Sequence, residues 1–121
     1  LVVVLLGINN LGMGNTPGEA ALGVALVLRK LRTKVPKAKI LLLGLFPTRK
    51  TEDAAKVREV NDYLAKMDDG ETIRYFNINS RFLGKDGKLR QDLFRDTVHL
   101  SRSGYVVWGE STRAAVKALM K

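Results

Sequence analysis

Apolar residues gather in three short runs, which longer segments of helical periodicity separate. Leu1–Leu6 is continuous and ends at Gly7, and Ile40–Leu43 is continuous and ends at Gly44. Unbroken apolar runs of this length are typical of strands buried on both faces of a parallel sheet. Thr72–Phe76 is expected to be a third strand, shorter than Leu1–Leu6. We expect the three to lie in one parallel sheet, with Leu1–Leu6 as a central strand.

The segment after the first strand carries the start signal of a helix. Thr16 is a favoured N-cap residue, Pro17 suits the first helical position, and Glu19 completes a capping box three residues after the cap. A helix is therefore expected from about Pro17 to Thr33.

Two further helices are expected later in the chain. Thr51 is expected to cap a helix over about 52–67, whose apolar residues recur at helical spacing. Ser101 or Ser103 is expected to begin a last helix that ends near Met120. The chain thus alternates strand and helix.

This alternation is the pattern of an α/β fold with a parallel sheet. No internal repeat, linker or low-complexity tract divides the sequence, so residues 1–121 are expected to form one domain. Ligands of such folds bind beyond the carboxyl ends of the strands. Chemistry is therefore expected in the loops after Leu6, Leu43 and Phe76, and in the segment before the last helix.

Composition narrows the class of protein further. Of the 121 residues, 45% are hydrophobic and none is cysteine, and the apolar runs fall far short of the roughly 20 residues that span a bilayer. The chain opens without an initiator methionine and without the features of a signal peptide. We therefore expect no membrane span. We also expect that the first strand is truncated at its start and that residues upstream of it are missing. The compartment stays open, because a chain without thiols suits the cytosol and secretion alike.

The formal net charge of +9 invites comparison with nucleic-acid-binding proteins. The basic residues are densest at the end of the first predicted helix and in the loop after it, where cations complement the helix dipole. No base-stacking aromatic residues are interleaved with them, so no specific nucleic-acid binding is expected. The residues of this basic cluster are Arg29, Lys30, Arg32, Lys34, Lys37 and Lys39.

The single histidine, His99, follows Asp96 by three positions, just before the last predicted helix. In a turn, residues so spaced project to the same side, so the carboxylate can hold one imidazole nitrogen while the other faces a cleft. A serine hydrolase needs such an imidazole, which takes the proton of the nucleophile and returns it to the leaving group. The spacing also fits a surface histidine beside a capping aspartate, and that alternative stays open. A metal site is disfavoured, because no cysteine or second histidine could complete it.

Gly7-Ile8-Asn9-Asn10, directly after the first strand, is the second candidate segment. An amide at this edge of the sheet, such as that of Asn9, can donate a hydrogen bond to a developing oxyanion. The alternative is a plain turn, because glycine and asparagine are favoured wherever a chain leaves a strand.

The two candidate segments, taken together and in this order, resemble the SGNH hydrolase family, also called GDSL esterases and lipases. Gly7–Asn10 is similar to the Gly-x-Asn-Asp block of that family, with Asn10 in place of the usual aspartate. Asp96–Ser101, with Gly104, Tyr105 and Trp108 after it, is similar to the closing block of the family.

Intervening segments extend the resemblance over nearly the whole chain. Ile40–Pro47 and Val60–Leu64 are also similar to the family, most of all to the α-subunit type of platelet-activating-factor acetylhydrolase. The resemblance implies a three-layer, flavodoxin-like parallel sheet, truncated at the N-terminus, and places the chain in the C-terminal two-thirds of an SGNH hydrolase.

The function that the resemblance implies is hydrolysis of carboxylic esters with a short acyl group, such as acetyl, through an acyl-serine intermediate. Asp96 and His99 would be catalytic, Asn9 would donate in the oxyanion hole, and no metal or organic cofactor is implied. A carbohydrate O-acetylesterase of the same fold is an open alternative. So is a non-catalytic α/β module whose basic face binds an anionic partner.

The nucleophile is expected outside this chain. The Gly-Asp-Ser block of the family and its second block are absent, and Ser80, Ser101, Ser103 and Ser111 lie in other contexts. The expected partners are a small-molecule or carbohydrate ester and the missing N-terminal segment of the same protein. A second copy of the chain is a further candidate, because the Leu1–Leu6 strand would be left with an unpaired edge.

Overall fold

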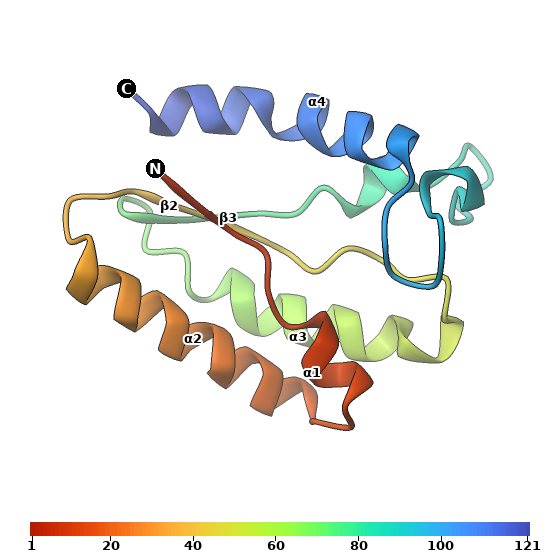
Figure 1. Cartoon of the computed structure of the whole chain (residues 1–121), viewed down its shortest axis with the longest axis horizontal. Helices are drawn as coiled ribbons and strands as arrows, with labels where there is room; N and C mark the ends of the chain where they lie inside the picture. The colour runs from red at the N-terminus through yellow and green to blue at the C-terminus, as the bar shows by residue number, and fades with distance from the viewer.

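A three-stranded parallel sheet forms the centre of the computed structural model, which describes residues 1–121 (Figure 1). Strands β1 (Val2–Val4), β2 (Ile40–Leu43) and β3 (Ile73–Phe76) lie in that order across the sheet. Val2 lies opposite Ile40, and Ile40 lies opposite Ile73. The whole of β2 is buried, because it has a strand on each side and helices over both faces.

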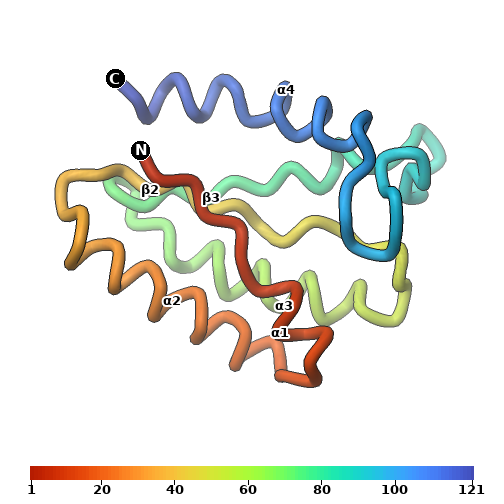
Figure 2. Tube along the Cα trace, in the orientation of Figure 1, coloured from red at the N-terminus to blue at the C-terminus, as the bar shows by residue number.

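Helices cover both faces of the sheet and make it the middle of three layers. Helices α2 (Pro17–Lys34) and α3 (Ala54–Ala65) pack together on one face, and α4 (Arg102–Leu119) lies across the other (Figure 1). The strands all run toward one end of the molecule, where the short helix α1 (Ile8–Gly12) and the loops before α4 gather (Figure 2). The predicted fold class, a three-layer α/β fold with a parallel sheet, is confirmed.

The expectation that Leu1–Leu6 is a central strand is wrong for this sheet. β1 contains only three residues and lies at the edge, while β2 is the central strand. Val3 is 46% exposed, because no strand pairs with the outer side of β1. An apolar run of this kind indicates that a strand can be buried on both faces, but it does not show which strands pair with it.

The capping box predicted for α2 is present. The Thr16 hydroxyl accepts a hydrogen bond from the Glu19 amide at 3.1 Å, and the Glu19 carboxylate accepts one from the Thr16 amide at 3.1 Å. At the other end of the helix, the Arg32 guanidinium donates to the carbonyl oxygens of Pro36 and Ala38. Arg32, a residue of the basic cluster, therefore stabilises the turn that leads into β2.

The second predicted helix is shorter than expected. Residues 51–53 form one turn of 3-10 helix, α3 begins only at Ala54, and the Thr51 side chain makes no capping hydrogen bond. The helix ends at Ala65. Four residues later, the Asp69 carboxylate accepts hydrogen bonds from the amides of residues 71–73 and organises the turn into β3.

The last helix begins where expected. Ser101 is its N-cap, and the Ser101 hydroxyl accepts a hydrogen bond from the Gly104 amide at 3.2 Å. Buried side chains form two clusters. The larger lies between the sheet and the α2–α3 pair. The smaller lies under the start of α4 and consists of Ile78, Phe82, Leu93, Phe94 and Leu100. None of the helices combines the length and the apolar composition needed to cross a lipid bilayer.

Candidate active site

The segment that carries Asp96 and His99 is a closed loop anchored at both ends in the smaller core cluster. Phe94 and Leu100 pair as an isolated antiparallel bridge, and both side chains are buried. Inside this bridge, the Arg95 amide donates to the His99 carbonyl oxygen at 3.0 Å. The loop therefore stands out from the domain on two fixed supports, immediately before α4 (Figure 2).

Within this loop, the Asp96 carboxylate binds both the backbone and the imidazole. Asp96 Oδ1 accepts hydrogen bonds from the amides of Val98 at 3.0 Å and His99 at 2.7 Å, which is an aspartate turn. Asp96 Oδ2 lies 2.8 Å from His99 Nδ1. The His99 amide first, and then the Val98 amide, hold the pKa of the Asp96 carboxyl at about 2, below its ordinary value. The carboxylate therefore stays ionised at neutral pH.

The imidazole of His99 has its second nitrogen free. The His99 side chain is 60% exposed, and Nε2 makes no hydrogen bond within the protein. When Nδ1 carries the proton and donates it to Asp96, the lone pair of Nε2 points away from the carboxylate. A nitrogen held in this way can take a proton from a nucleophile and pass it on.

Asn9 lies at the carboxyl end of β1, in the first turn of α1. Gly7 precedes this helix with a φ of 126°, a backbone conformation that favours glycine, and so lets the chain turn sharply out of the sheet. The sequence predicted a turn here, and the short helix α1 was not foreseen. The Asn9 side chain is exposed and makes no hydrogen bond within the protein, so its amide is free to donate.

An apolar pocket joins the two candidate segments. Its volume is about 80 Å³, and its wall contains Ile8, next to Asn9, and Val98, next to His99. The remaining wall comes from the segments that follow β1 and β2, namely Leu5, Leu6, Leu45, Phe46 and Thr48. The two segments therefore meet at the carboxyl edge of the sheet.

The side chains of Asn9 and His99 are not in contact with each other. Asn9 borders a separate hollow of about 340 Å³ between the end of β1 and α2, and His99 borders neither this hollow nor the apolar pocket. The structure thus brings Asp96 and His99 together directly, and brings Asn9 to the same edge of the sheet through its neighbour Ile8.

Sequence reasoning missed the residues that fix the loop after β2. The Asn61 side chain, buried in α3, accepts a hydrogen bond from the Leu45 amide at 2.7 Å and donates one to the Leu45 carbonyl oxygen at 3.0 Å. The side-chain amide of Asn79 donates to the same carbonyl oxygen at 2.8 Å. The signal was present, because Asn61 is a polar residue on the apolar face that Val60 and Leu64 mark in α3.

A single backbone bond then ties the loop after β2 to the candidate loop. The Arg49 amide donates to the Thr97 carbonyl oxygen at 2.9 Å. Because Leu45 is fixed at one end and Arg49 at the other, the wall of the apolar pocket and the Asp96–His99 loop are held together.

None of the serines in the chain forms a hydrogen bond with His99. Ser101 donates its hydroxyl proton to the Asp92 carbonyl oxygen at 2.6 Å and caps α4. The Ser111 hydroxyl is buried in α4 without a hydrogen-bond partner. The structure also contains no group of three or more His, Asp or Glu side chains arranged to hold a metal ion.

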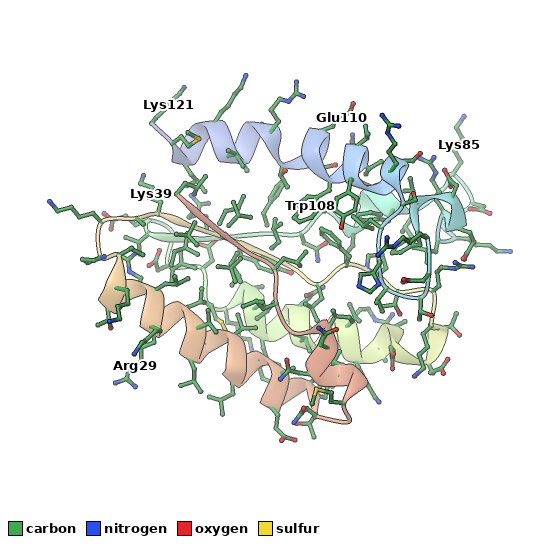
Figure 3. The ribbon with its side chains drawn as sticks, viewed as in Figure 1. Arg29, Lys39, Lys85, Trp108, Glu110 and Lys121 are labelled. Carbon is green, nitrogen blue, oxygen red and sulfur yellow. The ribbon has the colours of Figure 1, made fainter.

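The basic cluster lies away from this site. Figure 3 shows Arg29 extending from α2 away from the sheet, and Lys39 near the end of the molecule opposite the loops. Lys39 immediately precedes β2, whereas the candidate residues follow the carboxyl ends of the strands.

Known proteins with a related sequence are found among acetylhydrolase subunits. The alpha2 subunit of platelet-activating factor acetylhydrolase IB from Gallus gallus is 29% identical over 108 residues, and that from Rattus norvegicus is 30% identical over 109 residues. The human alpha1 subunit is 29% identical over 108 residues. Each alignment covers 87% of this chain and 46% of the relative, so the chain spans about half the length of these proteins.

The fold has a counterpart among solved structures. A structure named for a platelet activating factor of Streptococcus pneumonia superposes with a TM-score of 0.79 at 20% identity, and covers 93% of this chain and 57% of that one. At this identity the likeness concerns the fold. The sequence model of the GDSL-like lipase/acylhydrolase family matches residues 1–107. The resemblance found in the sequence is thereby confirmed, and the chain belongs to the GDSL-like lipase/acylhydrolase family.

Proposed function

We propose that residues 1–121 are one domain, a C-terminal part of a serine ester hydrolase, and that this domain supplies the acid–base pair of the active site. The observation that carries the proposal is the pairing of Asp96 with His99. The carboxylate lies 2.8 Å from Nδ1, the imidazole is 60% exposed, and Nε2 is free at the edge of the sheet where such folds bind ligands.

In the proposed reaction, a serine hydroxyl from outside this chain attacks the carbonyl carbon of a carboxylic ester. His99 Nε2 takes the hydroxyl proton as the Oγ–C bond forms, and Asp96 holds the tautomer and stabilises the imidazolium. The carbonyl oxygen becomes an oxyanion, to which the amide of Asn9 donates a hydrogen bond. Collapse of this intermediate breaks the bond to the alcohol, which leaves with the proton from His99.

Water then completes the cycle. His99 takes a proton from a water molecule, which attacks the acyl-serine, and the proton returns to the serine oxygen as the carboxylic acid leaves. The apolar pocket beside Val98, at about 80 Å³, has room for a short acyl group such as acetyl. All protons in both half-reactions pass through Nε2, so no metal or organic cofactor is needed.

The proposal is tested in the complete protein, with the serine-bearing segment present. His99→Ala is expected to lower turnover of 4-nitrophenyl acetate by several orders of magnitude, because no other group is placed to move the proton. Asp96→Asn should also lose most activity, since the amide cannot stabilise the imidazolium. Asp92→Asn is the matched control, because Asp92 lies in the same region but pairs with Arg90 on the surface, and it should retain near-normal turnover.

Asn9 is tested separately by its own pair of variants. Asn9→Ala removes the proposed oxyanion donor and is expected to lower kcat by about 100-fold or more, with little change in KM. Asn10→Ala removes the side-chain amide of the neighbouring residue, which is also exposed, and should change kcat by less than about threefold. Normal turnover in His99→Ala would overturn the proposal as a whole, whereas equal effects in the two asparagine variants would overturn only the role of Asn9.

A further inference from the structure

Two leucines of α2 point away from the sheet into solvent. Leu22 is 60% exposed and Leu26 is 57% exposed, whereas Val24 and Leu28, on the opposite side of the helix, are buried. Residues four apart lie on the same side of a helix, so the two leucines are neighbours on its outer face. The outer face of a surface helix ordinarily carries polar residues, and two adjacent leucines there leave apolar surface in contact with water.

The same outer face continues into the basic cluster. Arg29 and Lys30 follow Leu26 by three and four positions, which places them in line with the leucines, and both are exposed. Figure 3 shows the Arg29 side chain extending away from the sheet. We call Leu22, Leu26, Arg29 and Lys30 the outer stripe of α2. Further exposed cations lie at the end of the helix and in the turn after it, namely Lys34, Lys37 and Lys39.

No carboxylate forms an ion pair with these cations. The sequence contains no acidic residue between Glu19 and Glu52, and Glu19 is held by the capping box at the start of the helix. The cations that do form ion pairs lie elsewhere, namely Lys50, Arg74, Arg90 and Arg95.

The neighbouring helix α3 differs from α2 in this respect. Its exposed cations Lys56, Arg58 and Lys66 are interspersed with Glu59 and Asp62. Uncompensated positive charge therefore characterises α2 and the turn after it, and it coincides there with exposed apolar surface.

These two properties together favour one kind of partner. Nucleic acid would neutralise the cations but leave the leucines facing a phosphate backbone. A second copy bound face to face would bury the leucines, but it would bring the cations of one copy against those of the other. An anionic lipid surface satisfies both, because its headgroups attract the cations while the acyl chains receive the leucines. It also conforms to a convex helix, and neither leucine borders the two pockets described above.

We propose that the outer stripe of α2 binds the surface of a membrane that contains anionic lipids. Leu22 and Leu26 insert at the boundary between headgroups and acyl chains, and Arg29 and Lys30 lie against the headgroups. No helix of the domain is able to span a bilayer, so the contact is confined to the membrane surface. The stripe is separate from the Asp96–His99 loop, and the inference does not depend on the proposed ester hydrolysis.

The test measures sedimentation of the complete protein with phosphatidylcholine vesicles that contain or lack about 30% phosphatidylserine. The affinity for the anionic vesicles is expected to be about tenfold higher or more. Arg29→Gln/Lys30→Gln should lower that affinity about 30-fold, because each cation near such a surface contributes about fivefold. Leu22→Gln/Leu26→Gln should lower it about tenfold or more, because glutamine does not insert among the acyl chains.

Matched controls change the same kinds of side chain outside the stripe. Arg58→Gln/Lys66→Gln removes two exposed cations of α3. Val106→Gln/Met120→Gln removes two exposed apolar side chains at α4, on the other face of the sheet. Each control should change the affinity for the anionic vesicles by less than about threefold.

A measurement on the unaltered protein keeps the test independent of side effects of the substitutions. In about 1 M NaCl the screening length falls to about 3 Å, so the preference for the anionic vesicles should shrink. No preference for these vesicles at low salt, or equal losses in stripe and control variants, would overturn the proposal.

Other results would overturn it by assigning the stripe to a different partner. A dimer that Leu22→Gln/Leu26→Gln dissociates, or a lower midpoint of urea unfolding in that variant, would mean that a second copy or another part of the protein covers the leucines. Tighter binding to a DNA duplex than to the anionic vesicles would assign the cations to nucleic acid. Turnover of the soluble ester 4-nitrophenyl acetate should be unchanged in both stripe variants, so this proposal and the proposed function can fail separately.

Discussion

Asn61→Ala, which removes a buried side-chain amide, should destabilise the domain far more than Asn79→Ala, although both side chains form hydrogen bonds with Leu45. The Leu45 carbonyl oxygen accepts from both side chains, so in either single variant it keeps one donor. The Leu45 amide has only Asn61 as its acceptor, at 2.7 Å. Leu45 is 1% exposed, so in Asn61→Ala water cannot replace the lost partner.

The expected size of the effect follows from these contacts. An orphaned buried amide costs about 1–3 kcal/mol, and each hydrogen bond lost without leaving an orphan about 0.5–1.5 kcal/mol. We therefore expect Asn61→Ala to lower the free energy of unfolding by about 2–4 kcal/mol, and Asn79→Ala by about 1 kcal/mol. The first value is a large share of the roughly 5–15 kcal/mol that stabilises a typical domain.

Equilibrium unfolding in urea measures both values, with the fluorescence of the single tryptophan, Trp108, as the signal. Trp108 packs edge-on against Phe46, the residue after Leu45, at 5.3 Å between ring centroids, so it reports on this part of the fold. Equal losses in Asn61→Ala and Asn79→Ala, or a loss below about 0.5 kcal/mol in Asn61→Ala, would refute the argument from the orphaned amide.

Two further predictions concern the supports of the candidate loop. Gly104→Ala should lower the free energy of unfolding by about 1–3 kcal/mol in the same urea assay, because a Cβ there would collide with the Leu93 carbonyl oxygen, whereas Gly109→Ala, in open space on α4, should raise it by about 0.5–1 kcal/mol. Similar losses in both variants would contradict the steric explanation. The pKa of Asp96, followed by carboxyl NMR against pH, should be about 2. Because this folded-state value lies below the ordinary 3.8, the carboxylate stabilises the loop above about pH 4, and that contribution is lost as the pH falls through 2. A midpoint near 3.8 would contradict the bonding described for Asp96.

The alternation of apolar runs and periodic segments was sufficient to predict the α/β class, the parallel strands and the capping box of α2. The apolar run alone did not predict the place of β1, because it shows what a strand tolerates on its faces and not which strands pair with it. The family resemblance did imply that this strand has an unpaired edge, and β1 lies at the edge of the sheet. The start of α3 was misplaced for a related reason. Threonine is favoured as a cap, but at Thr51 the chain first makes a 3-10 turn, and no sequence signal distinguishes the two.

At the candidate site, a local pair was easier to predict than a distant one. The spacing of Asp96 and His99 fits the contact that the structure contains, because three residues of a turn suffice to bring the two groups together. The apolar pocket beside the loop depends on residues far away in the sequence, namely Leu5, Leu6, Ile8, Leu45, Phe46 and Thr48. Their meeting with the loop is a product of tertiary packing, and only the general rule for strand ends pointed to it.

The bonding of Asp96 to amides two and three positions further on has a consequence for how this site can adapt. The carboxylate cannot swing away from the imidazole without breaking two main-chain hydrogen bonds, so any movement of the loop carries both groups together. Substitutions elsewhere in the domain can change the position of the Asp96–His99 pair relative to the sheet and the residues that surround the pair. Any such variant keeps the pairing of the two groups, because its hydrogen bonds lie within the four consecutive residues Asp96–His99.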